Sequence, residues 1–327
     1  MSELDLESLR TRLAAAGVCD VRPLTGGASS LTFRATRGDR PVVVKVAPPG
    51  HTPVGHRDVL RQSRIIEALA ATDVPVPEVL CTDPGAPPEI PPLFVMSLVE
   101  GESFEPLFDT DAAREDTDGA RKDTVPERFR SAARVLAALH RVPPADLGLT
   151  GEPVGDAVAE VDRWSATLRT VDPALVPGWT AVREALVATA PAPVRPGVVH
   201  GDYRLGNLVA CGTAITAVID WEIWSVGDPR IDLGWFLVNA DPDTYRRPTP
   251  YVDAVPAVAE LASCYTDAVG APMPELPWFT ALACFKSAAT WSLIVKHNRR
   301  KSTPRAELEA MAPTLPHLLE RATTLLG

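Results

Sequence analysis

Cysteine is scarce in this sequence, and its few cysteines are not arranged for disulfides or zinc. The five cysteines among 327 residues are odd in number and widely scattered. None of them forms a CxxC pair, and no histidine lies at zinc-ligand spacing from them. We therefore expect reduced, mostly buried thiols in a cytoplasmic protein.

Secretory and membrane-spanning signals are also lacking. Residues 1–7 read MSELDLE, with neither the positively charged nor the apolar segment of a signal peptide. The longest nearly apolar window, Phe279 to Val295, is interrupted by Lys286, and we expect it to be too short and polar to cross a bilayer. The sequence thus gives no reason to expect export or a membrane partner.

A surplus of positive charge is missing as well. Lys and Arg number 32 against 42 Asp and Glu, so the formal net charge is −10. This sign argues against nucleic acid as a partner, because the phosphate backbone attracts basic surfaces. With 46% hydrophobic and 23% charged residues, a chain of this length is typical of a globular protein with two domains or two lobes.

Proline is abundant, with 33 residues spread over the chain, and it predicts many loops. Apolar periodicity and turn residues divide the first hundred residues. The expected elements are a short helix at about 4–16, strands at 29–36 and 41–47, a helix at 59–71, and strands at 78–82 and 93–99. They indicate a small β-rich lobe with one helix, at 59–71, in addition to the short helix at its start.

An acidic stretch separates this lobe from a differently composed second half. Residues 102–127 are rich in Asp, Glu and turn formers, which predicts a solvated connector. The elements expected beyond it are a helix at about 128–141, helical segments between 156 and 190, short strands near 198–199, 208–210 and 215–219, and a mainly helical remainder from 232.

The chemistry is concentrated in two short segments. Residues 199–207 read VHGDYRLGN, and residues 219–222, after a predicted strand, read IDWE. Asp202, Asn207 and Asp220 lie at strand edges and can converge as a hairpin folds back. Phosphoryl transfer needs such convergence, because a carboxylate must orient the attacking hydroxyl while oxygen ligands hold Mg²⁺. Capping of turns is the alternative role for Asp202 and Asn207.

These segments resemble the aminoglycoside phosphotransferase and choline kinase family, including the kinase-like domains fused to some acyl-CoA dehydrogenases. The HGDxxxxN, IDWE and GDPxxDL patterns occur in order at 200–207, 219–222 and 227–233, with weaker agreement from about 20 to 300. The resemblance implies an α+β, protein-kinase-like bilobal fold. Its nucleotide-binding lobe would cover residues 1–100 and end in the hinge, and its larger, mainly helical catalytic and acceptor-binding lobe would cover 101–327.

Within this resemblance, the catalytic segment assigns further roles. Arg204 corresponds to a position where protein kinases place a basic residue that neutralises the transferred phosphoryl group, and a structural ion pair is its alternative role. His200 is expected to hold the loop by hydrogen bonds rather than to move protons. Asp228 and Asp232 are expected to brace it.

Lys45 lies in the apolar strand VVVKV, where an ammonium is costly unless an anion pairs with it. An ATP phosphate would be that partner, and an exposed edge strand is the alternative. Gly27, Ser29 and Ser30 lie in a segment, GGASS, that resembles the family's loop over the phosphates. This segment precedes the hairpin that carries Lys45, which is the arrangement kinases use.

Gln62 departs from the family pattern. The family has a glutamate in the first helix, within an Arg-Glu dipeptide, that pairs with the lysine, whereas this sequence has Arg61-Gln62. At about 100° per residue, Gln62 falls on the apolar face of its helix and points inward. It can accept a hydrogen bond from Lys45 but supplies no charge, which points to reduced or specialised activity.

The segment FVMSLVEG, residues 94–101, resembles the family's hinge between the lobes. The Ser97 carbonyl and the Val99 amide would then bind the adenine edge, and Met96 would line the adenine pocket. A core strand that ends in a turn would have a similar sequence.

The sequence as a whole favours a kinase that uses ATP, or GTP, with Mg²⁺ to phosphorylate a hydroxyl of a small molecule. The acceptor classes that stay open are aminoglycoside-like, choline-like, macrolide and hydroxyacyl compounds, and the acidic total would suit a cationic one. The competing hypothesis is a nucleotide-binding pseudokinase that acts through a partner. A metal-dependent hydrolase would leave Lys45 and the hinge unexplained.

Overall fold

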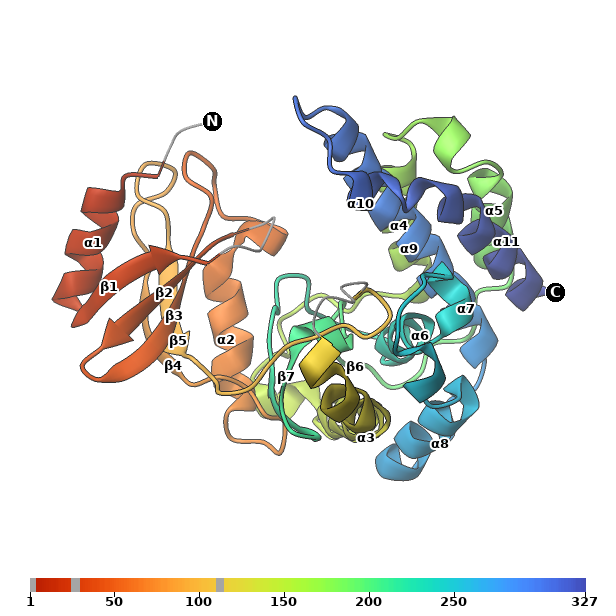
Figure 1. The fold of residues 1–327 in the computed structure, drawn as a ribbon, viewed down its shortest axis with the longest axis horizontal. Coiled ribbons are helices and arrows are strands. Elements are labelled where there is room, and N and C mark those ends of the chain that lie inside the picture. Colours follow the sequence, from red (N-terminus) through yellow and green to blue (C-terminus); the bar gives the residue numbers. More distant parts are fainter. Residues whose placement is uncertain (1–3, 25–29, 110–114) are drawn as a thin grey trace. The chain divides into compact units, whose positions relative to one another are not determined.

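A computed structural model describes residues 4–24, 30–109 and 115–327 of the chain (Figure 1). The chain forms two compact units. We call Met1–Ser103 with Asn207–Trp224 the sheet unit, and Phe104–Gly206 with Ser225–Gly327 the helical unit. The sheet unit thus includes residues 207–224, which the expected division at residue 100 assigns to the second lobe.

The sheet unit is built on a five-stranded antiparallel sheet in the order β1-β2-β3-β5-β4. The bounds are α1 Leu6–Ala15, β1 Val18–Pro23, β2 Leu31–Arg37, β3 Arg40–Val46, α2 Val59–Leu69, β4 Val79–Asp83 and β5 Leu93–Ser97. Successive residues of a strand point to opposite faces. Val42, Val44 and Val46 therefore share one core with Leu9 and Leu13 of α1. Lys45 points to the other face, where its Nζ donates to Gln62 of α2. Helices α1 and α2 lie on either side of the sheet (Figure 1).

A hairpin completes the sheet unit from far along the chain. Strands β7 Leu208–Cys211 and β8 Ala214–Val218 pair with each other. Glu102 and Ala210 exchange two backbone hydrogen bonds of 3.0 and 2.9 Å, and the Val218 amide donates to the Pro75 carbonyl at 2.8 Å. Gly101, with φ +132°, permits this approach, because a Cβ there would lie 2.5 Å from the Ala210 carbonyl oxygen.

The helical unit packs around α9, Leu276–Arg299. Its other helices and strands are α3 Glu115–Arg141, α4 Ala157–Leu168, α5 Trp179–Ala188, β6 Gly197–Val199, β9 Ser225–Gly227, α6 Arg230–Asn239, α7 Pro242–Tyr245, α8 Val258–Val269, α10 Ala306–Glu309 and α11 Leu315–Leu326. Buried residues of α4, α5, α6, α9 and α11 form one apolar cluster. The short strands β6 and β9 pair antiparallel beside the start of the HGD segment.

The prediction of a solvated connector over 102–127 is wrong in its second half. Helix α3 begins at Glu115, well before the expected start at 128, and continues through Pro126. Val125 and Phe129 are both fully buried, so packing of one face stabilises a segment whose composition is typical of a loop. Strands β1 and β9 were not expected either, because each is short and partly polar.

Helix α9 meets the length and composition of a membrane span, contrary to the expectation for residues 279–295. It is the one such helix among the described residues. Within the helical unit, however, 72% of its most apolar 18-residue window is buried. The core helix of a folded unit has these same properties.

Candidate active site

In the sheet unit, Lys45 contacts two residues that the sequence analysis singled out, Gln62 and Asp220, although only the contact with Gln62 was expected. Its Nζ donates to Asp220 Oδ1 at 2.7 Å and to Gln62 Oε1 at 3.3 Å. Lys45 is 9% exposed, so the ammonium is held largely away from water, and the carboxylate offsets that cost. The predicted contact with Gln62 is present, and the edge-strand alternative for Lys45 is wrong, because β3 lies between β2 and β5.

Asp220 and Asn207 lie at the two ends of the β7–β8 hairpin. The Ile219 amide donates to the Asn207 carbonyl at 3.0 Å, which brings the two chain segments together. Asp220 has φ +66°, a conformation that is costly outside glycine and occurs often at functional sites. An amide oxygen and a carboxylate oxygen are suitable Mg²⁺ ligands.

No three His, Cys, Asp or Glu side chains within the described ranges form a metal-binding group. Mg²⁺ typically takes only one or two protein carboxylates and completes its shell with phosphate oxygens and water. Asn207 and Asp220 fit that requirement as a pair of oxygen donors.

Helix α2 is fixed so that Gln62 faces Lys45. Asp58 caps the helix by accepting from the Leu60 and Arg61 amides, both at 3.1 Å. Arg61 donates to the Trp224 carbonyl at 2.8 Å, and its guanidinium lies 3.8 Å above the Trp224 ring. Gln62 Nε2 is a buried donor without a hydrogen-bond partner in the described part of the chain. A phosphate oxygen beside Lys45 would satisfy this donor.

The predicted hinge residues end strand β5. Met96 is buried, and Ser97 turns its hydroxyl toward β4, where Oγ accepts from the Glu78 amide at 3.0 Å. The Leu98 amide donates to Pro41 at 3.2 Å, whereas the Val99 amide has no backbone partner among the described residues. Of the predicted phosphate loop, Gly27 and Ser29 lie outside the described residues, and Ser30 is buried.

In the helical unit, Asp232 braces the catalytic loop, as predicted. Its carboxylate accepts from the His200 amide at 2.6 Å and from the Gly201 amide at 2.8 Å. His200 is fully buried, and its Nδ1 accepts from the Asp202 amide at 3.1 Å, so the imidazole holds the loop as expected. Burial would raise the pKa of Asp232, but hydrogen bonding and proximity to His140 and His200 lower it overall.

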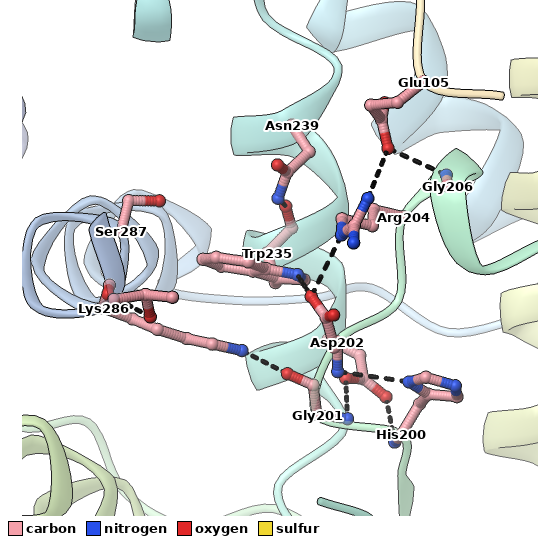
Figure 2. A network of polar contacts seen from close by, with 12 residues as sticks. Glu105, His200, Gly201, Asp202, Arg204, Gly206, Trp235, Asn239, Lys286 and Ser287 are labelled. Carbon is pink, nitrogen blue, oxygen red and sulfur yellow. Dashed lines mark hydrogen bonds and ion pairs between the residues drawn. The ribbon is translucent and has the colours of Figure 1, made fainter. Parts of the chain in front are cut away.

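The Asp202 carboxylate is held from two sides, as Figure 2 shows. Trp235 Nε1 of α6 donates to Asp202 Oδ1 at 2.8 Å, and Arg204 Nε lies 3.4 Å from the same oxygen. Arg204 also contacts Glu105 Oε2 at 3.3 Å, and Glu105 accepts from the Gly206 amide at 2.8 Å. Arg204 is therefore part of an ion-pair network, which was the alternative left open for it.

Burial shapes the charges of this network. Desolvation raises the pKa of Glu105, against the lowering effect of Arg204 and the Gly206 amide. For Arg204, desolvation alone would lower the pKa, but Asp202 and Glu105 raise it, so the guanidinium stays charged. The network thus supplies one fixed positive charge beside the proposed base.

Sequence reasoning missed three residues of the loop's surroundings: Glu105, Trp235 and Lys286. Lys286 Nζ donates to the Gly201 carbonyl from the buried helix α9. Lys286 could have been identified from the sequence, because burying an ammonium in an apolar helix is as costly as burying that of Lys45 in its apolar strand. Glu105 lay in the stretch interpreted as a solvated connector, and no local pattern marks Trp235.

The sequence comparisons identify the family of this chain. The model of the phosphotransferase enzyme family named APH matches residues 20–262, and the chain belongs to this family. It is similar to "Probable acyl-CoA dehydrogenase IBR3" of Arabidopsis thaliana, with 27% identity over 76% of this chain and 32% of that protein. It is also similar to human "Acyl-CoA dehydrogenase family member 11", with 25% identity over 80% of this chain and 34% of that protein. The chain thus spans about a third of the length of these relatives.

Solved structures confirm the predicted α+β, protein-kinase-like fold. A Ralstonia eutropha protein classed with the aminoglycoside phosphotransferases superposes with a TM-score of 0.74 at 22% identity, over 98% of this chain and 99% of that one. The macrolide 2'-phosphotransferase of Brachybacterium faecium gives 0.57 at 22% identity, over 95% and 98%. APH(4)-Ia in complex with AMP-PNP and hygromycin B gives 0.61 at 17% identity, over 96% and 98%.

Proposed function

We propose that the chain is an ATP- and Mg²⁺-dependent phosphotransferase that phosphorylates a hydroxyl group of a small molecule. The observation that carries this proposal is the ion pair of Lys45 with Asp220, 175 positions apart in sequence. It lies beside the buried Gln62 amide donor, which has no hydrogen-bond partner among the described residues. A cation, a carboxylate and a free donor at one place suit polyphosphate with a metal ion. Family membership supports the same reaction class.

The residues of the sheet unit would bind the nucleotide. Lys45 and Gln62 would donate to phosphate oxygens, and the buried Met96, with the Ser97 carbonyl and the Val99 amide, would receive the base. Asn207 and Asp220 would hold Mg²⁺, which when bound neutralises negative charge on the phosphates. The positions assigned to Gly27, Ser29 and Ser30, over the phosphates, stay a prediction.

The residues of the helical unit would act on the acceptor. Asp202 would accept the hydroxyl proton or orient the hydroxyl, because its Oδ1 is fixed by Trp235. Arg204, held between Asp202 and Glu105, would offset the charge that develops at transfer. We further propose a cytoplasmic location, and an acceptor that is cationic in keeping with the net charge of −10.

Calorimetric titration of ATP and of GTP, with and without Mg²⁺, into four proteins tests the nucleotide site. We expect Mg²⁺-dependent binding by the wild type and by Asp39→Ala, an exposed control in the same unit. Asp220→Ala should lose that binding, and Asp202→Ala should keep it while ADP formation is abolished. Failure of the wild type to bind either nucleotide would overturn the proposal, and turnover by Asp202→Ala would overturn the role of Asp202.

Gln62 also supports a second candidate, a nucleotide-binding pseudokinase that acts through a protein partner. Lys45 pairs with a neutral amide where the family resemblance places an acid, so its ammonium is positioned less strongly. Gln62→Glu separates the candidates. A large gain in ADP release would indicate a weakened enzyme, whereas binding without turnover in either form, with cationic, macrolide and hydroxyacyl acceptors, would favour the binding module.

A further inference from the structure

Lys286 is a buried cation that the proposed chemistry does not use. It lies in α9 and is 5% exposed. Its Nζ donates to the Gly201 carbonyl and lies 3.8 Å from the Trp235 ring centroid and 5.3 Å from that of Trp164 (Figure 2). Within the described residues, no carboxylate forms a salt bridge with it. A carbonyl and two ring faces offset only part of the cost of burying an ammonium.

Two of the groups around Lys286, the Gly201 carbonyl and the Trp235 ring, lead directly to Asp202. Gly201 precedes Asp202 in the chain and has φ +86°, so its peptide groups take directions that other residues rarely allow. Lys286 fixes the carbonyl of Gly201, while Asp232 fixes its amide. Trp235, whose ring lies against the ammonium, donates from Nε1 to Asp202 Oδ1 at 2.8 Å. The lysine therefore contacts both the backbone and the indole that orient the carboxylate.

We propose that Lys286 is a positioning residue, whose ammonium holds the Gly201 carbonyl and the Trp235 indole so that Asp202 keeps one orientation toward the acceptor hydroxyl. This inference rests on the proposed phosphotransferase function. An apolar side chain of similar length would fill the same space, so the charge and the donor are what the loop needs from position 286.

The charge on Lys286 changes near neutral pH. Burial lowers its pKa to about 8, although Asp202 in the loop, Glu160 of α4 and Asp232 of α6 raise it, while Arg163 of α4 lowers it. The ammonium is therefore present below pH 8 and is lost as the pH rises through that value. Since the neutral amine interacts more weakly with the ring and the carbonyl, turnover should fall above pH 8.

Three variants test this role: Lys286→Met, Lys286→Arg and the control Lys296→Met. Lys296 lies on the same helix and also donates to a backbone carbonyl, that of Thr170, away from the loop. We expect Lys286→Met to lower kcat for ADP release from Mg²⁺-ATP by about tenfold to a hundredfold, with KM for ATP within twofold. Lys286→Arg should recover activity and lose the decline above pH 8, because guanidinium does not titrate there.

Amide hydrogen exchange in the peptide covering residues 197–206 provides a readout that does not depend on turnover. We expect faster exchange in Lys286→Met at pH 7 and wild-type exchange in Lys296→Met. Wild-type kcat and exchange in Lys286→Met would overturn the proposal, as would activity that rises above pH 8, which would indicate a base instead. If the wild type releases no ADP with any acceptor, the proposed function fails, and unchanged exchange then still refutes the positioning role.

Discussion

Asp232 directs both carboxylate oxygens at the backbone of the catalytic loop and lies entirely out of contact with water. Two amide donors and the nearby His140 compensate for its burial. Loss of that carboxylate would leave buried donors without acceptors, which costs more than an ordinary hydrogen bond contributes. At the scale of single residues, the order of the loop therefore depends on this side chain as much as on Asp202.

We expect Asp232→Asn to lower the free energy of unfolding of the helical unit by about 2–4 kcal/mol, because the new amide NH₂ group would face a backbone N–H donor instead of accepting from it. The pKa of Asp232 in the folded protein lies below the ordinary value of 3.8, so its contribution is complete above that value and is lost as the pH falls through the lowered pKa. Urea unfolding should give the same difference at pH 5 and pH 7. The exposed control Asp253→Asn should change little, and a difference that grows from pH 5 to pH 7 would contradict this account.

Helices α6 and α9 pack with almost no space between them at Gly234. Every residue of α6 is buried, and α9 contributes many buried residues to an apolar cluster of the helical unit. A Cβ at Gly234 would lie 2.5 Å from the Phe279 carbonyl oxygen and 2.6 Å from its carbon. Because those atoms belong to the backbone of a long helix, they cannot move aside cheaply. At the scale of elements, this contact sets how closely Trp235 and Lys286 approach each other.

Gly234→Ala should therefore lower the free energy of unfolding of the helical unit by about 1–3 kcal/mol, even though alanine favours a helix by about 1 kcal/mol over glycine. Gly151→Ala is the matched control, since no atom lies within 4 Å of its added Cβ. Urea denaturation of both variants measures the effect. Equal stability of the two variants would contradict this account, because it would mean that the backbone of α9 at Phe279 shifts to accommodate the added Cβ.

The sequence predicts local elements well where one face of the chain is regularly apolar. The hairpin around Lys45 and the inward face of α2 with Gln62 follow from alternation and helical period alone. Helix α3 could not be predicted over 115–127, because its acidic residues and Pro126 suggest a loop, and only packing of Val125 and Phe129 stabilises it. Glu105 was not identified as a site residue for the same reason, because it lies in the stretch whose composition suggests a loop.

At the scale of the whole molecule, each of the two compact units contains an apolar cluster among its described residues. One contains α1 and the sheet, and the other surrounds α9. The catalytic segment 200–207 ends where the chain passes from the helical unit into the sheet unit, between Gly206 and Asn207. Spacing in the sequence predicted that Asp202, Asn207 and Asp220 converge. It could not predict that Asn207 and Asp220 belong to the sheet unit and Asp202 to the helical unit, because that division depends on long-range pairing such as that of Glu102 with Ala210.

The division into two compact units predicts thermal unfolding that is not two-state. We expect the calorimetric enthalpy to exceed the van't Hoff enthalpy, with two transitions under the heat-capacity peak. Gly101→Ala, whose Cβ would meet the Ala210 carbonyl oxygen, should lower the transition of the sheet unit. Gly234→Ala should lower that of the helical unit. A single two-state transition that both variants shift together would contradict this expectation.

The sheet unit is discontinuous in the chain, and this has a consequence for its synthesis. Its first segment ends at Ser103, but the segment that supplies Asp220 to Lys45 ends at Trp224, about 120 residues later. At about 5–20 residues per second, a ribosome needs on the order of 6–24 s to make the intervening chain. During that interval the nascent sheet lacks the carboxylate for its buried ammonium and the hairpin that joins Glu102. Residues 1–103 must therefore leave the ribosome first and complete their fold only after the whole of Phe104–Gly206 has been made.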